Sequence, residues 1–295
     1  MNYNIELRHF RYFRAVAEEL SFRKAAEKLF ISQPGLSKQI KQMEDAVGAT
    51  LFDRTKQKVS LTSAGTFLLG EIEFINNHLE LTINNLKLIA EGFDGEVRIG
   101  FLGSAMHNVV PELMVKLNKN YPKIKTSLEE MSNKSQLRAI ENDQLDLGFV
   151  RLARVPEGIS KKAIFKDSFS VVLPENHQLT EKSFNNVGQL ANESFIFFTS
   201  DYSPYYYDKM MSICEDQGFS PKISHKSVNA LTIFKLVENG LGVAIVPTTL
   251  QHGFNLNVKF IEIKNIPQQA ELSVIWKEDN RNPCLESIKK LLFEK

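Results

Sequence analysis

Two groups of polar residues in this chain have types and spacings that could bind a ligand, and the first lies near the N-terminus. The stretch "ISQPGLSKQI", residues 31–40, sets polar residues between apolar ones at roughly helical spacing. Proline and glycine are poor in a helix interior, yet the first turn tolerates proline because its N–H has no intrahelical partner there. The stretch therefore predicts a helix capped by Ser32, with Pro34 in its first turn and Gly35 allowing close approach of a phosphate backbone.

The exposed end of this predicted helix has the chemistry to contact DNA. Glutamine can pair with adenine, and lysine can bind guanine or a phosphate. Arg54 and the tip TKQK, residues 55–58, would reach backbone phosphates as a wing. From spacing alone two interpretations stay open, a DNA-reading helix-turn-helix and a three-helix bundle with solvated polar faces. The residues concerned are Gln33, Pro34, Ser37, Lys38 and Lys41.

The second group follows the ends of predicted strands in the rest of the chain. Ligands of an open α/β sheet bind at the carboxyl ends of its strands, near helix N-termini that favour an anion. Each residue also has a plainer interpretation, as a helix cap, a loop hydroxyl or, for the arginine, the partner of a surface carboxylate. Our hypothesis is a small carboxylate-bearing effector bound by Ser104, Asn133 and Thr199 or Ser200. Arg151 is a further candidate for effector binding, with an ion pair to a surface carboxylate as the slightly favoured alternative.

No catalytic constellation is evident in the sequence. There is no GxSxG, no phosphate-cradling glycine loop, no HExxH and no Cys/His cluster, and the six histidines lack ligand spacing. We therefore expect neither an enzyme nor a metal or other cofactor. The rival class is a solute-binding module whose N-terminal part contacts only proteins. Salt-dependent DNA binding would distinguish the two.

The periodicity of the chain predicts the elements that position these groups. Residues 6–60 form short helices followed by two extended pieces, and residues 63–92 form a long helix. A seven-residue repeat along that helix predicts a dimer seam, with a helix lying on its own domain as the alternative. After the GFDG hinge at 92–95, strands and helices alternate, which implies parallel sheets with helices on both faces. The seam residues are Leu68, Ile72, Ile75, Leu79, Thr82, Leu86 and Ile89.

Composition and charge agree with a nucleic-acid-binding module joined to a larger body. Of the 295 residues, 43% are hydrophobic and 24% charged. Residues 1–60 carry a net charge of +4 and the remainder −3. Charges in the N-terminal segment argue against a signal peptide, and no apolar run reaches the ~20 residues of a membrane span, so we expect a cytoplasmic protein with no membrane partner. Cys214 and Cys284 lack a second ligand nearby, which predicts buried or half-buried thiols, with a redox switch between them as the alternative.

The segment from Leu7 to Gly65 resembles the DNA-binding domain of LysR-type transcriptional regulators, over about 60 residues without a gap. Its Lys38 stands where the family often has arginine, and a point charge favours phosphate contact over guanine readout. The matching residues are Leu7, Phe13, Ala17, Ser21, Ala25, Ala26, Leu29, Ser32, Gln33, Pro34, Ser37, Ile40, Glu44, Gly48, Leu51, Phe52, Arg54, Thr62 and Gly65.

The resemblance implies an α+β multidomain fold. Its parts would be a winged helix-turn-helix (1–62), a linker helix (63–92) and an α/β effector domain (93–295) of two periplasmic-binding-protein-like subdomains. These subdomains would cover 93–165 with 268–295, and 166–267. It also implies a homodimer or homotetramer bound to operator DNA, an effector between the subdomains, RNA polymerase as a partner of activators, and Ser32, Arg54 and Thr62 among the DNA-binding residues.

Two stretches of the effector domain add detail. The LGFVR stretch with Arg151 and the block VIWKED resemble family members that respond to aromatic-catabolism intermediates. Three consecutive tyrosines, Tyr205–Tyr207, cannot all face the core of one helix. They would line a polar aromatic pocket or form an inter-subunit contact.

Overall fold

The computed structural model describes residues 5–54 and 58–293, so Thr55, Lys56 and Gln57 of the predicted wing tip lie outside it. The chain divides into two compact units, Met1–Ile83 and Asn84–Lys295. This division falls inside a helix that the sequence assigns to a separate linker. The domain boundaries proposed above stay a prediction.

The first unit is a winged helix-turn-helix. It contains α1 (Leu7–Glu19), α2 (Phe22–Leu29) and α3 (Gln33–Val47), then the antiparallel strands β1 (Phe52–Arg54) and β2 (Val59–Leu61), and the start of α4 (Ser63–Ala90). The Ser32 hydroxyl accepts a hydrogen bond from the Gly35 N–H at 3.3 Å, Pro34 lies in the first turn, and Gly48 ends α3 at a φ of 70°. The predicted start and end of α3 are therefore confirmed.

The Glu44 carboxylate on α3 fixes the wing against the helices. It accepts hydrogen bonds from the N–H groups of Leu51 at 2.8 Å and Phe52 at 3.2 Å, and it pairs with Arg54 at 2.7 Å. Phe52 then packs on Phe13 with ring centroids 5.0 Å apart. One half-buried carboxylate thus accepts hydrogen bonds from two backbone N–H groups at the start of β1, and so holds Phe52 where it packs on Phe13.

The predicted dimer seam along α4 is only partly free. Ile72 is fully buried in the core of the first unit, and Leu68 packs against the same core. The alternative, a helix lying on its own domain, is therefore right for the first turns of α4. Leu86 and Ile89 are 61% and 60% exposed, so the later turns keep an apolar face.

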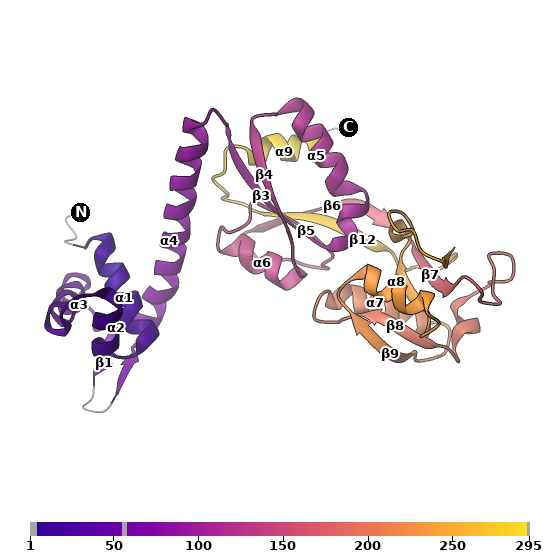
Figure 1. The fold of residues 1–295 in the computed structure, drawn as a ribbon, viewed down its shortest axis with the longest axis horizontal. Coiled ribbons are helices and arrows are strands. Elements are labelled where there is room, and N and C mark those ends of the chain that lie inside the picture. The colour runs from indigo at the N-terminus through magenta and orange to yellow at the C-terminus, as the bar shows by residue number, and fades with distance from the viewer. Residues whose placement is uncertain (1–4, 55–57, 294–295) are drawn as a thin grey trace. The chain divides into compact units, whose positions relative to one another are not determined.

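The second unit contains a five-stranded sheet in the order β4-β3-β5-β12-β6. Strands β3 (Gly95–Phe101), β4 (Ile124–Glu130) and β5 (Leu147–Val150) are parallel, whereas β12 (Ala270–Lys277) is antiparallel to both β5 and β6 (Ile159–Asp167). The expectation of purely parallel sheets is therefore wrong here. Figure 1 shows α5 (Val109–Asn120) and α9 (Leu285–Phe293) on one face of this sheet and α6 (Asn133–Glu141) on the other.

A second subdomain is built on two smaller sheets. The antiparallel sheet β10-β7-β11 uses β7 (Phe169–Pro174), β10 (Ala244–Pro247) and β11 (Val258–Glu262), and β8 (Ser194–Phe198) pairs in parallel with β9 (Lys222–Ser227). Helices α7 (Pro204–Glu215) and α8 (Ala230–Glu238) pack on its core. The chain crosses between subdomains twice, between β6 and β7 and between β11 and β12, and Asp167 and Ala270 pair with each other at these crossings.

The two cysteines are buried free thiols, as expected, and burial raises the pKa of both. Across residues 5–54 and 58–293, no helix has the length and apolarity needed to cross a bilayer. Within the same residues, no three His, Cys, Asp or Glu side chains gather as a metal site.

Two glycines of α4 should respond oppositely to alanine. A Cβ at Gly65 would lie 2.1 Å from the Leu51 carbonyl oxygen, whereas a Cβ at Gly70 would meet nothing within 4 Å. We expect Gly65→Ala to destabilise the first unit by about 2 kcal/mol or more through overpacking. Gly70→Ala should stabilise it by ~0.5–1 kcal/mol. Calorimetry of the full chain measures both effects, and equal melting of Gly65→Ala and wild type would contradict this packing.

Candidate functional site

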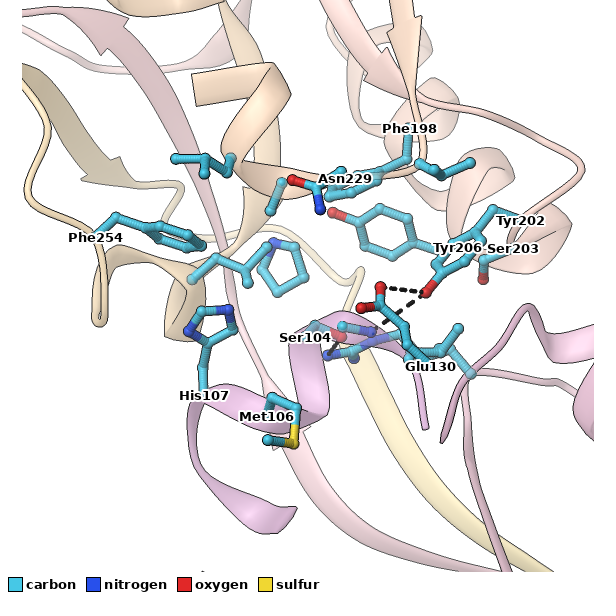
Figure 2. A pocket seen from close by; sticks show the side chains of 18 residues that line it. Ser104, Met106, His107, Glu130, Phe198, Tyr202, Ser203, Tyr206, Asn229 and Phe254 are labelled. Atoms are coloured by element: carbon cyan, nitrogen blue, oxygen red, sulfur yellow. Dashed lines mark hydrogen bonds between the residues drawn. The ribbon is translucent and has the colours of Figure 1, made fainter. Parts of the chain in front are cut away.

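A cavity of about 300 Å³ opens between the two subdomains of the second unit (Figure 2). The short 3-10 helix η1 (Gly103–His107), α7, the N-terminus of α8 and the end of β10 surround it. Its volume is at the lower end of small-molecule sites. Most of the lining is apolar, with Leu102, Met106, Phe198, Val228, Leu231, Leu250 and Phe254.

Arg151 supplies a buried cation to this cavity. It follows β5 and is 4% exposed. Its Nη1 donates to the Ala270 carbonyl at 2.7 Å and its Nη2 reaches the Ser104 hydroxyl at 3.5 Å, while Nε has no partner. Within the described chain no carboxylate oxygen lies within 4 Å of this guanidinium, so the interpretation of Arg151 as the partner of a surface carboxylate is wrong.

Asp167 and Tyr206 lie near Arg151, but neither forms a hydrogen bond with its guanidinium in the described residues. Burial lowers the pKa of Arg151, although an arginine stays protonated in proteins. The nearby Asp167 carboxylate is held by the Thr249 hydroxyl at 2.6 Å, and burial raises the pKa of Asp167. The Tyr206 hydroxyl is buried, has no hydrogen-bond partner in the described residues and points into the cavity in Figure 2. Buried polar groups without partners indicate a place for a ligand or water.

Asn133 holds the backbone of Arg151 instead of lining the cavity. Its side-chain amide donates to the Arg151 carbonyl at 3.0 Å and to the Ser203 hydroxyl at 2.8 Å, and its oxygen accepts from the Arg151 N–H at 3.0 Å. Asn133 is 1% exposed. The polar side chain that the sequence places at the start of α6 therefore positions the arginine.

Of the five predicted effector residues, the structure brings Ser104 and Arg151 together in the cavity lining. Ser104 does not cap a continuous helix over 104–120. The helical structure is interrupted after η1, and the side chain of Asn108 caps α5. Thr199 and Ser200 follow β8 but are outside the cavity lining, and the Thr199 N–H bonds to the Ser227 carbonyl at 3.1 Å.

Several cavity residues had no predicted role. The Tyr202 hydroxyl donates to Glu130 at 3.1 Å and accepts from the Gly103 N–H at 3.3 Å (Figure 2). His107 packs on Phe254 with ring centroids 4.9 Å apart, and burial lowers the pKa of His107. Among the aromatic residues of the lining, only Tyr206 belongs to a pattern that the sequence analysis singled out, the run Tyr205–Tyr207.

The three consecutive tyrosines divide between different surroundings. Tyr206 lines the cavity, which agrees with the pocket interpretation. Tyr207 packs edge-on against Phe197 in the subdomain core, with ring centroids 6.0 Å apart. The Lys209 ammonium lies 5.4 Å from the Tyr205 ring centroid.

The predicted DNA-contacting residues of α3 share one exposed end. Ser32, Gln33, Pro34, Lys38 and Lys41 are exposed and Ser37 is half-buried. Gln33 Nε2 lies 3.4 Å from the Ser37 hydroxyl. Leu36 and Ile40 on the other side of the helix are fully buried, so the core fixes which face α3 presents.

The other predicted DNA contacts already have partners inside the first unit. Arg54 pairs with Glu44 and lies 4.6 Å over the Phe22 ring. The Thr62 hydroxyl donates to the Thr50 carbonyl at 2.8 Å and accepts from the Gly65 N–H at 3.0 Å. A role for either in DNA binding stays a prediction. Phe30, which the sequence did not single out, is 95% exposed beside the start of α3.

Comparison with known proteins agrees with both parts of this description. Residues 7–66 match the bacterial regulatory helix-turn-helix of the lysR family, and residues 90–294 match the LysR substrate binding domain. The chain belongs to the LysR family of DNA-binding transcriptional regulators.

Relatives align over nearly the whole length. The chain is 33% identical to the regulator AlsR of Bacillus subtilis, covering 96% of this chain and 93% of AlsR. It is 30% identical to BenM of Acinetobacter baylyi, covering 88% of this chain and 86% of BenM. The crystal structure of full-length BenM superposes with a TM-score of 0.59, at 26% identity over 97% of this chain and 96% of that one. These relatives are transcriptional regulators, so the expectation that the chain is no enzyme is confirmed.

The role of Asn133 can be measured as stability. Asn133→Ala should lower the free energy of unfolding by about 1–3 kcal/mol, because the buried Arg151 N–H loses its acceptor. The matched control is Lys134→Ala on the exposed neighbour, which should stay within ~0.5 kcal/mol of wild type. Urea unfolding followed by the fluorescence of Trp276, the single tryptophan, reports on this sheet. Equal stability of the two variants would contradict the assignment.

Proposed function

We propose that this regulator binds a small carboxylate effector in the cavity between its regulatory subdomains, with Arg151 and Ser104 as the anion-binding groups. The observation that carries the proposal is the buried Arg151 guanidinium, which faces an apolar cavity with no carboxylate at hydrogen-bond distance in the described chain. An unpaired buried charge is costly, and a ligand carboxylate would compensate it. The N-terminus of α8, at Asn229 and Ala230, lines the same cavity and favours an anion.

Effector binding would act on DNA through the arrangement of the domains. A ligand shifts an equilibrium only by its difference in affinity for the two states. The cavity walls come from both subdomains, so a ligand that touches both walls binds best in one arrangement. In a dimer or tetramer, that arrangement would set how two α3 helices meet half-sites about 34 Å apart.

For DNA recognition we propose that Gln33 reads a base and Lys38 contacts a phosphate. Both lie on the exposed end of α3, where an entering helix presents its N-terminal residues to the major groove. Pro34 and Ser37 complete this surface, and Lys41 extends it by one turn. Lys38 forms no ion pair within the described residues, which leaves its charge available.

The effector site is tested with small carboxylic acids and their uncharged amides, using calorimetric titration of the full chain. Acids should bind and amides should not. Ser104→Ala and Arg151→Lys should each weaken the acid about tenfold or more, because a charge-assisted contact is lost or misaligned. Thr199→Ala, outside the cavity lining, serves as the control and should bind as wild type does. Affinity unchanged by Ser104→Ala and Arg151→Lys would refute the assignment.

The two α3 residues should differ in how they affect DNA binding. With duplexes selected by the wild-type protein from a random pool, Gln33→Ala should cost about 1–3 kcal/mol and relax preference at one base. Lys38→Ala should weaken all sequences alike and reduce the slope of log affinity against log salt by about 0.9. Mobility shifts at several salt concentrations with selected and scrambled duplexes separate the two. A uniform loss for Gln33→Ala would contradict base reading.

A further inference from the structure

The effector cavity contains a carboxylate as well as a cation. Glu130 ends β4 and lines the cavity. A Cβ placed on Gly103 would lie only 2.7 Å from Glu130 Oε1, so the absence of a side chain at Gly103 admits this carboxylate. Among the described residues Glu130 accepts one hydrogen bond, from Tyr202, and its Oε2 keeps its capacity to accept more.

The carboxylate and the guanidinium flank consecutive residues. Glu130 lies against Gly103, and Arg151 Nη2 reaches the hydroxyl of Ser104. Gly103 and Ser104 are consecutive residues of η1, so the two charges approach the same short segment of the cavity lining. Figure 2 shows both Glu130 and Ser104 among the side chains that line the cavity. Two opposite charges in the lining of one small cavity suit a ligand that carries both an anionic and a cationic group.

Among the other lining residues that the structure describes, none is charged at neutral pH. His107 is the other ionisable base, and burial lowers its pKa so that the neutral ring dominates. The described lining therefore carries one positive group, Arg151, and one negative group, Glu130, among mostly apolar residues. A second carboxylate on the ligand would meet Glu130 and be repelled, whereas an ammonium group would be attracted. The lining thus disfavours a diacid.

We propose that the effector is an α-amino acid with an apolar side chain. Its carboxylate binds Arg151 and Ser104, its ammonium group donates to Glu130, and its side chain packs on apolar residues such as Phe198 and Leu231. The Tyr202 hydroxyl holds the Glu130 carboxylate in place through its hydrogen bond. This inference rests on the proposed carboxylate site and adds the class of the molecule bound there.

Matched ligand pairs test the amine. Calorimetric titration of the full chain uses alanine, valine, leucine, isoleucine, methionine, phenylalanine, tyrosine and tryptophan. Each is paired with the acid that carries hydrogen in place of the amine. At least one amino acid should bind the wild type about tenfold or more tighter than its deaminated partner, because the partner lacks a charge-assisted hydrogen bond.

A variant of Glu130 assigns that preference to a residue. Glu130→Gln should weaken the amino acid about tenfold while leaving the deaminated acid as tight or tighter, because the repelling charge is gone. Glu129→Gln, the exposed neighbour on the same strand, is the control and should behave as wild type. Thermal melting of both variants confirms that they fold.

The outcomes separate this inference from the proposed function. Deaminated acids that bind as tightly as the amino acids, with no effect of Glu130→Gln, would overturn the amino-acid assignment and leave the carboxylate site standing. No binding by any compound in either series would overturn both. Amino-acid binding that survives Glu130→Gln unchanged would also refute the contact.

Discussion

The buried guanidinium of Arg151 is the constraint on which the organisation of the regulatory unit depends. Removing a cation from water is costly unless hydrogen bonds and opposite charge replace the lost hydration. Here Nη1 bonds to the Ala270 carbonyl, and Asn133 holds the arginine backbone on both its N–H and its carbonyl. Ala270 pairs with Asp167, and these residues are the points at which the chain crosses between subdomains. The charge that faces the cavity is therefore attached to the connection between the subdomains.

The elements that could be predicted from sequence are those with a local physical cause. Ser32, Pro34 and Gly48 each fix one end of α3 through a cap, a tolerated proline or a left-handed residue, and each of these effects is readable within a few residues. Buried strands such as β7 and β8 read as continuous apolar runs. Strands β6 and β9 have no such local signal, because their sequences, ISKKAIFKD and KISHKS, are partly or largely solvent-exposed and lack clean apolar alternation.

Apart from the family resemblance, the sequence could predict the site only through the general rule that ligands of an α/β sheet bind near the carboxyl ends of its strands. The strand-end rule named Ser104, which does line the cavity, whereas Arg151 was singled out only through the family resemblance of the LGFVR stretch. The rule misplaced Asn133, whose side chain turns inward to the Arg151 backbone, because sequence does not give a rotamer. The hydrogen bond from Tyr202 to Glu130 joins residues 72 positions apart on different subdomains, and no local sequence pattern predicts it.

The distribution of cavity residues over the two subdomains separates affinity from regulation. Ser104, Glu130 and Arg151 all belong to the segments around the five-stranded sheet, whereas Phe198, Leu231 and Phe254 belong to the other subdomain. A ligand held by the charged groups alone would bind equally well however the subdomains are arranged, and so would shift no equilibrium. Contact of an apolar ligand body with the second subdomain, together with the Tyr202 hydroxyl, makes affinity depend on arrangement. For the proposed effector, the charged groups would then select the molecule, and its apolar part would supply the free-energy difference that a regulator needs.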